Sequence, residues 1–181
     1  MGALQATSLL IRDKCNILIH INVNVNKSAP AYDRIRAFQE TCEEHHIPYD
    51  IDLSVKGHSY HEILNVIRDI FNKIESKYPD QKKGIFLAND TYANMFLNLI
   101  FQKYGTFPST YEIVGFDNSP IASEAILPIT TIGQQINVIA KTAMDLLIQQ
   151  MENQKKRVPK PLGKPIHKQI TPILIRRNTT E

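Results

Sequence analysis

The hydrophobic and polar positions of the chain follow two alternating patterns. Short, nearly continuous apolar runs are typical of strands covered on both faces, and they predict strands at 16–23, 49–53, 84–88, 112–116, 128–132 and 166–176. Apolar residues that recur every three or four positions are typical of amphipathic helices. This spacing predicts helices at 3–13 and 134–151, a helix that ends near His46, and helices that begin after Ser59 and after Asn89-Asp90.

Local sequence supports several of these helix starts. Ser59 and Glu62 have the spacing of a capping box, and Asn89 and Asp90 have the short polar side chains that cap helices. Strands and helices alternate at intervals of roughly 25–35 residues, which predicts an α/β fold with a parallel sheet and helices on both faces. The alternation begins on a helix, so we expect the strand before it to be missing and the fold to be truncated at the N-terminus.

The composition is that of a folded domain. Of the 181 residues, 43% are hydrophobic and 22% are charged, which excludes intrinsic disorder and collagen-like repeats. No apolar run reaches the roughly 20 residues of a membrane span, and the first residues lack the basic segment of a secretory signal. We therefore expect a cytoplasmic protein without membrane contact, in which Cys15 and Cys42 are buried thiols.

The formal net charge of +3 is concentrated near the C-terminus. From Lys155 onward there are eight basic residues and one acid, which leaves 13 basic and 17 acidic residues in the rest of the chain. A surface that binds nucleic acid usually has a basic stripe interleaved with aromatic residues, and the sequence shows no such stripe. We expect a solvated basic tail and no direct binding of nucleic acid by this chain.

Polar residues follow most of the predicted strands, and in open α/β sheets ligands bind at those strand ends. They are Asn24, Asn26, Ser54 to Ser59, Asn89-Asp90 and Asp117-Asn118-Ser119, with Arg34 and Arg36 in the helix after the first strand. Carboxylates, amides and a guanidinium can hold the vicinal hydroxyls of a sugar bidentately. Asn89, Asp90 and Asp117 could each be an ordinary helix cap, so their recurrence at several strand ends is what favours a shared site.

The sequence offers little support for catalysis. It contains none of the motifs GxGxxG, GxxxxGK[ST], GxSxG or HExxH. His58 and His61 could share a helix face, but no third ligand accompanies them, so we expect no metal site. We expect His20 to be a hydrogen-bonded core residue, and His45 and His46 to lie at the surface. The prediction is a protein that is not an enzyme and uses no cofactor.

Three motifs follow one another along the chain: Gly84-Ile-Phe-Leu-Ala-Asn-Asp90, Ile113-Val-Gly-Phe-Asp-Asn118 and Pro128-Ile-Thr-Thr-Ile-Gly-Gln134. Together they resemble the effector-binding domain of lactose-repressor-type (LacI/GalR) transcription regulators. Upstream, Arg34-Ile-Arg-Ala-Phe38 is similar to the family's R-x-x-G-[FY], with Ala37 in place of the usual glycine. The segment 170–179 is similar to the family's closing strand, so the resemblance covers essentially the whole chain.

The resemblance implies a two-lobed, periplasmic-binding-protein-like (type I) fold in a cytoplasmic regulator that binds operator DNA as a homodimer. It assigns residues 1–165 to the C-terminal lobe of the effector-binding domain, with 1–15 near the lobe junction, and 166–181 to the closing strand and tail. The DNA-binding domain is expected to be absent from this chain, so operator DNA would be bound only through that missing N-terminal domain. The implied effector is a small carbohydrate.

The resemblance also implies roles for five residues. Arg34, Asn89 and Asp117 correspond to family positions that contact the effector, and Gln134 corresponds to a glutamine at the hinge side of the cleft. His58 takes the place of an aromatic residue that stacks on the sugar in many members. An imidazole stacks more weakly and adds a hydrogen bond, so a more polar or phosphorylated sugar could fit. Pro30 replaces a small hydroxyl residue, which also leaves the effector's identity open.

Two other functions stay open from the sequence. A solute-binding protein of a sugar transporter has the same fold in another compartment, but the missing signal segment and the spacing of the last two motifs favour a regulator. A small α/β enzyme would need a nucleophile with a base, or a cofactor motif, and neither is present in the sequence. We therefore expect the effector-binding part of a LacI-type regulator, in which ligand binding changes operator affinity.

Overall fold

A mostly parallel sheet lies at the centre of the computed structural model, which describes residues 1–23, 30–57, 59–155, 158 and 163–181. Within these residues six strands pair in the order β2-β1-β3-β4-β5-β6. Their bounds are β1 Ile17–Val23, β2 Tyr49–Val55, β3 Lys83–Leu87, β4 Tyr111–Asp117, β5 Thr130–Gly133 and β6 Ile173–Ile175. The predicted parallel pairing is confirmed for β1 to β5, whereas β6 is antiparallel to β5. β6 runs in the opposite direction because the chain leaves the sheet at Gly133, the end of β5, and re-enters it at the same end, with Ile173 opposite Gly133.

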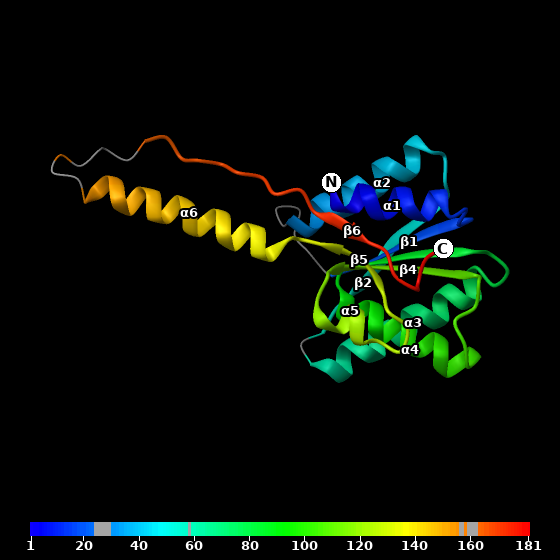
Figure 1. Ribbon diagram of the computed structural model, residues 1–181. Coiled ribbons are helices and arrows are strands. Elements are labelled where there is room, and N and C mark those ends of the chain that lie inside the picture. Colours follow the sequence, from blue (N-terminus) through cyan, green and yellow to red (C-terminus); the bar gives the residue numbers. More distant parts are fainter. Residues whose placement is uncertain (24–29, 58, 156–157, 159–162) are drawn as a thin grey trace.

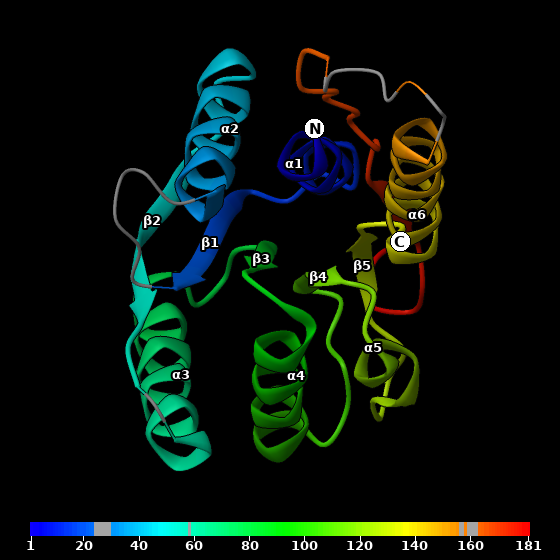
Figure 2. The ribbon, with the colours of Figure 1, turned by 90° about the vertical axis from the view of Figure 1, so that its left-hand side faces the viewer.

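Helices cover both faces of the sheet. α1 (Gly2–Arg12) and α2 (Pro30–Glu44) lie on one face, and α3 (Tyr60–Lys77), α4 (Asp90–Tyr104) and α5 (Pro120–Glu124) lie on the other (Figure 2). This arrangement confirms the predicted α/β class. α5 is not among the predicted helices, because a helix of 5 residues is too short to show a helical period.

The predicted helix starts have the expected caps. The Ser59 side chain accepts from the Glu62 N–H, and the Glu62 carboxylate accepts from the Ser59 N–H, which completes the capping box of α3. Asn89 caps α4. At the other end of α4, Gly105 takes the left-handed conformation that ends the helix without a steric penalty. Local sequence therefore sets where α3 and α4 begin, and the start of α4 fixes one loop of the candidate site.

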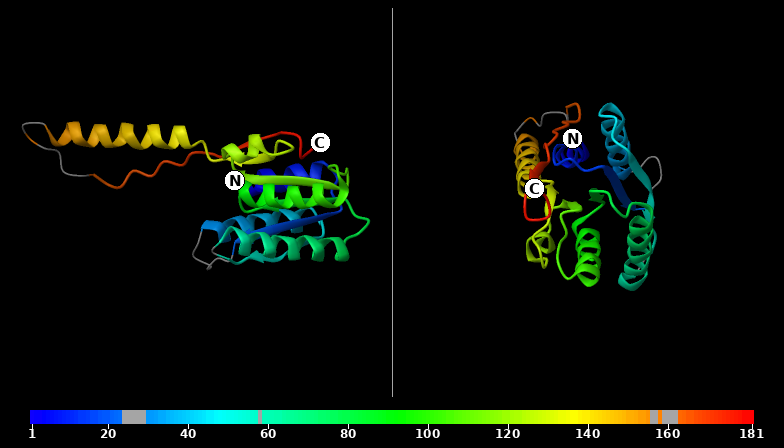
Figure 3. Two further views of the ribbon diagram at one scale, coloured as in Figure 1. Left: turned by 90° about the horizontal axis from the view of Figure 1, so that it is seen from below. Right: turned by 90° about the vertical axis from the view of Figure 1, so that its right-hand side faces the viewer.

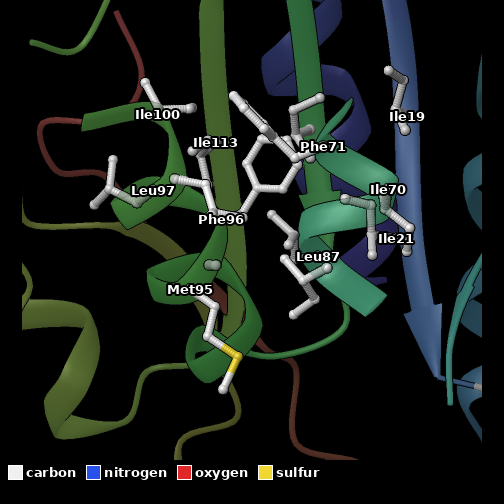
Figure 4. Packing of buried hydrophobic residues seen from close by; sticks show 14 of the residues in the cluster. Ile19, Ile21, Ile70, Phe71, Leu87, Met95, Phe96, Leu97, Ile100 and Ile113 are labelled. Carbon is white, nitrogen blue, oxygen red and sulfur yellow. The ribbon is translucent and has the colours of Figure 1, made fainter. Parts of the chain in front are cut away.

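Two apolar clusters hold the helices to the sheet. Between the sheet and the α3–α4 layer, the rings of Phe71 and Phe96 meet edge to face with their centroids 5.4 Å apart (Figure 4). On the opposite face Phe86 packs in a second cluster that includes Cys15 and Cys42, which are buried and free as predicted. Burial raises the pKa of both thiols to about 12, so neither is a reactive thiolate at neutral pH.

One long helix extends away from this body. α6 (Ile136–Gln154), all of whose residues the structure describes, has no buried residue. Residues 163–172 run back beside it before β6 rejoins the sheet (Figure 1, Figure 3). We term α6 and residues 163–172 the α6 arm, and the rest the sheet body. The predicted helix 134–151 is confirmed, the predicted extended segment 166–176 forms a strand only at β6, and the division into 1–165 and 166–181 stays a prediction.

The remaining expectations concern histidines and membrane spans. His20 is fully buried, and its Nδ1 donates to the Phe86 carbonyl oxygen at 2.8 Å, but its Nε2 has no partner within the described residues. The expected core histidine is therefore satisfied at one of its two nitrogens. His45 and His46 are exposed, as predicted. No helix in the described ranges combines the length and the apolar character that crossing a membrane requires.

Candidate functional site

The carboxyl ends of the parallel strands meet at one edge of the sheet. Asn89 follows β3, Asp117 ends β4 and Gln134 follows β5, while Arg34 lies in the first turns of α2. The structure thus brings four of the five predicted residues to this edge, and we term them the four site residues. The fifth, His58, lies outside the described residues, and so do Asn24 and Asn26.

Arg34 is held between the ends of β3 and β4. Its Nη1 donates to the carbonyl oxygen of Ala88, the residue before Asn89, at 2.8 Å. Its guanidinium carbon lies 4.4 Å from the ring centre of Phe116, the residue before Asp117, in a cation–π contact. Burial lowers the pKa of Arg34, and the nearby Asp117 carboxylate opposes this shift. The guanidinium is therefore a half-buried cation placed beside two other site residues.

Asn89 acts as a helix cap in the structure. Its Oδ1 accepts from the Tyr92 N–H at 2.8 Å, which is the capping role that the sequence analysis keeps open. The cap uses one acceptor of the amide, whereas the two donors are on Nδ2. Capping and ligand binding are compatible at this position because they use different atoms.

The turn that follows β4, Asp117–Ser119, has an unusual backbone, and we term it the β4 turn. Asp117 has a φ of 103° and Asn118 a φ of 52°, so two successive residues other than glycine occupy the left-handed region. Such conformations cost about 1–3 kcal/mol each and persist when the surroundings hold them. Gln134 Nε2 donates to Asp117 Oδ1 at 2.5 Å. This contact joins two site residues, and both border a cavity of about 420 Å³.

Asp90 lies beneath the β4 turn and is almost completely buried. Its Oδ1 accepts from Thr131 Oγ1 at 2.6 Å, and its Oδ2 accepts from the Ser119 N–H at 2.7 Å. Burial raises the pKa of Asp90, and these hydrogen bonds oppose the rise. Gly115 provides the space for this carboxylate, since a Cβ there would lie 2.3 Å from Asp90 Oδ1. The cap expected of Asn89-Asp90 is thus made by Asn89, while Asp90 ties α4 to β5 and the β4 turn.

The sheet edge combines one cation, one carboxylate and two amides. The guanidinium and amide groups can donate to hydroxyl oxygens, and the carboxylate can accept from hydroxyl hydrogens, so neighbouring hydroxyls can be held bidentately. The Phe116 ring adds an apolar surface under Arg34. Among the residues that the structure describes, no three His, Cys, Asp or Glu side chains come together as a metal site requires. The arrangement favours a polyol ligand.

Two contributors to this edge are missed by the sequence analysis. Thr131 Oγ1 bonds to Asp90 and also accepts from the Asn118 N–H at 3.3 Å. Arg177 Nη2 donates to Asn118 Oδ1 at 2.7 Å, so the prediction of a wholly solvated basic tail is wrong for Arg177. Arg177 lies in the segment 170–179 that resembles the family's closing strand, but that segment does not predict the contact, because the contact forms only when β6 returns to the sheet edge, 59 positions along the chain from Asn118.

The sequence model of one protein family matches almost the entire chain. That family is described as a periplasmic binding protein-like domain, and the match covers residues 8–180. The chain belongs to this family. The four site residues are therefore part of a periplasmic binding protein-like domain and lie at the edge of its sheet where the parallel strands end.

Curated relatives of this periplasmic binding protein-like domain are transcriptional repressors. The ribose operon repressor of Halalkalibacterium halodurans is 26% identical over 178 residues, which cover 98% of this chain and 50% of that protein. The repressor PurR of Vibrio atlanticus is 23% identical over 159 residues, which cover 87% of this chain and 46% of that protein. The chain thus spans about half the length of the curated relatives it matches. The resemblance to LacI/GalR-type regulators is confirmed.

Solved structures agree with the family assignment. A LacI family transcriptional regulator from an Arthrobacter species, in complex with lactose, has a TM-score of 0.78 at 17% identity over 99% of this chain and 62% of that one. A ribose operon repressor from Lactobacillus acidophilus has a TM-score of 0.72 at 20% identity over 99% of this chain and 61% of that one. At these identities the likeness establishes the fold.

Proposed function

We propose that this chain is the effector-binding part of a LacI-type transcription regulator and that its effector is a sugar or sugar phosphate. The observation that carries the proposal is the convergence of the four site residues at one sheet edge. Each hydroxyl of a sugar donates and accepts, and these residues supply both complementary functions. The repressor names of the relatives support a binding and regulatory role rather than a catalytic one.

Each side chain has a distinct role in the proposed complex. Arg34, fixed by its main-chain and ring contacts, donates in parallel to two neighbouring hydroxyl oxygens. Asp117 accepts from hydroxyl hydrogens through its carboxylate, and Gln134 keeps that carboxylate in place. Asn89 contributes the donors on Nδ2 that its cap does not use. His58 remains the proposed stacking residue.

We propose that the whole regulator is a cytoplasmic homodimer that binds operator DNA. The match to the periplasmic binding protein-like domain occupies residues 8–180. In this proposal the regulator binds operator DNA through a separate domain outside these residues. An effector that binds one arrangement of the dimer more tightly shifts the population toward that arrangement. Operator affinity changes with this shift when the two arrangements also bind operator DNA with different affinities. The repressor names of the relatives support this role.

Calorimetric titration of the full-length regulator with D-ribose, lactose and ribose 5-phosphate tests the proposal. We expect one of these sugars to bind, and we expect Asp117→Ala to weaken its binding by roughly 10- to 100-fold, because a charged acceptor of hydroxyl hydrogens is lost. Asp69→Ala is the matched control, since it removes an exposed carboxylate on α3. Its dissociation constant should stay within about twofold of the wild type.

Two results would contradict the proposal. Equal affinity of the wild type and Asp117→Ala for a bound sugar would place the site elsewhere. Failure of every sugar and sugar phosphate to bind the wild type would refute a carbohydrate effector.

A further inference from the structure

Groups from three segments hold the β4 turn. The Asn118 N–H donates to Thr131 Oγ1 of β5 at 3.3 Å, and the Ser119 N–H donates to Asp90 Oδ2 of α4 at 2.7 Å. From the segment after β6, Arg177 Nη2 donates to Asn118 Oδ1 at 2.7 Å. Because two successive residues are left-handed, the conformation of this turn depends on these neighbours more than on its own backbone preference.

Arg177 spans two acceptors with its guanidinium. Nη1 donates to the Ile129 carbonyl oxygen at 2.9 Å, while Nη2 reaches Asn118. Its own backbone N–H donates to Thr130 Oγ1 at 2.9 Å, which anchors the residue on the start of β5. A lysine could not reproduce both side-chain contacts, because its ammonium is a single point donor and lacks the planar fork of arginine.

The strand that leads to Arg177 also forms the base of the α6 arm. The chain leaves the sheet after β5 and returns through residues 171–172 into β6, and Gly133 lies opposite Ile173 in the antiparallel pair. Gln135 Nε2 donates to the Thr171 carbonyl oxygen at 2.6 Å and ties the outgoing passage to the returning one. The two passages therefore form one connected base.

Both sides of this base contact the same turn. Gln134, on the outgoing passage, donates to Asp117, and Arg177, beyond the returning strand, donates to Asn118. A displacement of β6 relative to β4 changes the second contact, because Arg177 follows β6 by two residues and Asn118 directly follows β4. The direction of the Asp117 carboxylate is in this way linked to the position of the α6 arm.

We propose that Arg177 is a positioning residue of the candidate site, which holds the β4 turn so that Asp117 stays beside Arg34 and which couples this carboxylate to the base of the α6 arm. A movement of the arm that shifts β6 weakens the hold on the turn and lowers the affinity for the effector. By thermodynamic reciprocity, an effector bound at Asp117 restrains the arm. The statements about the effector rest on the proposed function, whereas the statement about the turn does not.

Arg176 provides a matched control for Arg177. The two residues are adjacent and carry the same charge, but Arg176 is exposed whereas Arg177 is half buried and bonded to the β4 turn. Arg176→Met and Arg177→Met therefore remove the same charge from the same segment. Only the second substitution removes a donor to Asn118.

Amide hydrogen exchange followed by NMR tests the positioning role without a ligand. In Arg177→Met we expect exchange at the Asn118 and Ser119 amides to accelerate by roughly tenfold or more relative to the wild type, because the turn opens more readily. Exchange at Ile67 and Ile70 in α3 should stay within about twofold, and Arg176→Met should leave all four amides within about twofold. A uniform acceleration throughout the chain, or no acceleration at Ser119, would overturn the proposal.

The Asn118→Gly variant serves as a second background, which distinguishes a direct hold of Arg177 on the β4 turn from its contact with the Ile129 carbonyl oxygen before β5. Asn118→Gly removes the acceptor and supplies a residue that adopts a φ of 52° without strain. In this background we expect Arg177→Met to change Ser119 exchange by less than about twofold. If the tenfold effect persisted there, Arg177 would act through Ile129 rather than through the turn, and the proposal would be wrong.

Titration of the full-length regulator with D-ribose tests the coupling of Arg177 to effector binding. We expect Arg177→Met to raise the dissociation constant by roughly tenfold, and Arg176→Met to leave it within about twofold. A wild type that fails to bind D-ribose would count against this sugar, and the titration is then made with lactose or ribose 5-phosphate. Failure of all three would count against the proposed function, while the exchange experiment would still decide the role of Arg177. Equal dissociation constants for both variants would overturn the coupling to the effector.

Discussion

The sheet body and the α6 arm contain helices of similar apolar character that are buried to very different extents. α4 has seven buried residues, packed between the sheet and its neighbouring helices, whereas none of the 19 described residues of α6 is buried. Met144, Leu147 and Ile148 of α6 are each about half exposed. Helical periodicity therefore reports the presence of an apolar face, while tertiary contacts decide whether that face is covered.

The candidate site lies where these two regions meet. Asn89 and Asp117 follow buried strands of the sheet body, whereas Gln134 leads into the arm. Segments with few buried contacts open or move at a lower free-energy cost than a packed core. A site at this junction can therefore combine rigid positioning by the body with a response of the arm.

Truncation of a core ring of the sheet body should give the largest effect. Phe96 is fully buried, and its ring meets those of Phe71 and Tyr111 edge to face. Phe96→Ala is expected to lower the free energy of unfolding by about 3–5 kcal/mol, because apolar burial is lost and a cavity remains. Urea denaturation followed by circular dichroism measures this change. A loss below about 1 kcal/mol would show that the body is not packed around this ring.

Acid should lower the free energy of unfolding of the sheet body through protonation of His20. Burial lowers its pKa from 6.5 to about 4, so between these values the unfolded chain binds a proton that the native chain does not. The contribution of His20 to the free energy of unfolding therefore falls as the pH drops from 6.5 to 4, by about 3 kcal/mol. The charged residues of α6, by contrast, are exposed.

Urea denaturation at pH 7, 5.5 and 4.5 measures this dependence. His20→Gln keeps a donor for the Phe86 carbonyl oxygen but does not titrate, so its free energy of unfolding should fall less steeply with acid. His46→Gln, at an exposed position, is the matched control and should keep the wild-type slope. Identical slopes for His20→Gln and the wild type would contradict the assignment.

Much of the fold could be predicted from local sequence. β1 and β3 are apolar along nearly their full length because both of their faces are covered, and the caps at Ser59 and Asn89 mark the starts of two helices. The length and direction of β6 could not be predicted in this way, since its three residues are defined by pairing with the four of β5. A strand of three residues is too short to show the alternation of apolar and polar positions, so only its pairing with β5 defines it.

The candidate site could be predicted only in part, because some of its contacts are not encoded by neighbouring residues in the sequence. The motifs around Asn89 and Asp117 mark residues at strand ends, and parallel pairing brings those ends together. The left-handed backbone of Asp117 and the bond from Arg177 depend on contacts that form only in the folded chain. The strand-end motifs therefore predict which residues gather at the sheet edge, whereas the contact from Arg177 to the β4 turn is visible only in the folded chain.

The smallest expected effect is in the α6 arm. Leu147 is 49% exposed, whereas Leu97 of α4 is fully buried, so the same substitution can be compared in both regions. Leu147→Ala is expected to change the free energy of unfolding by less than about 0.5 kcal/mol, and Leu97→Ala to lower it by about 2–5 kcal/mol, both measured by urea denaturation of this chain. Because the two variants lose the same atoms, their difference isolates burial. A loss above about 1.5 kcal/mol for Leu147→Ala would mean that the arm is packed in solution, and the distinction between arm and body would then fail.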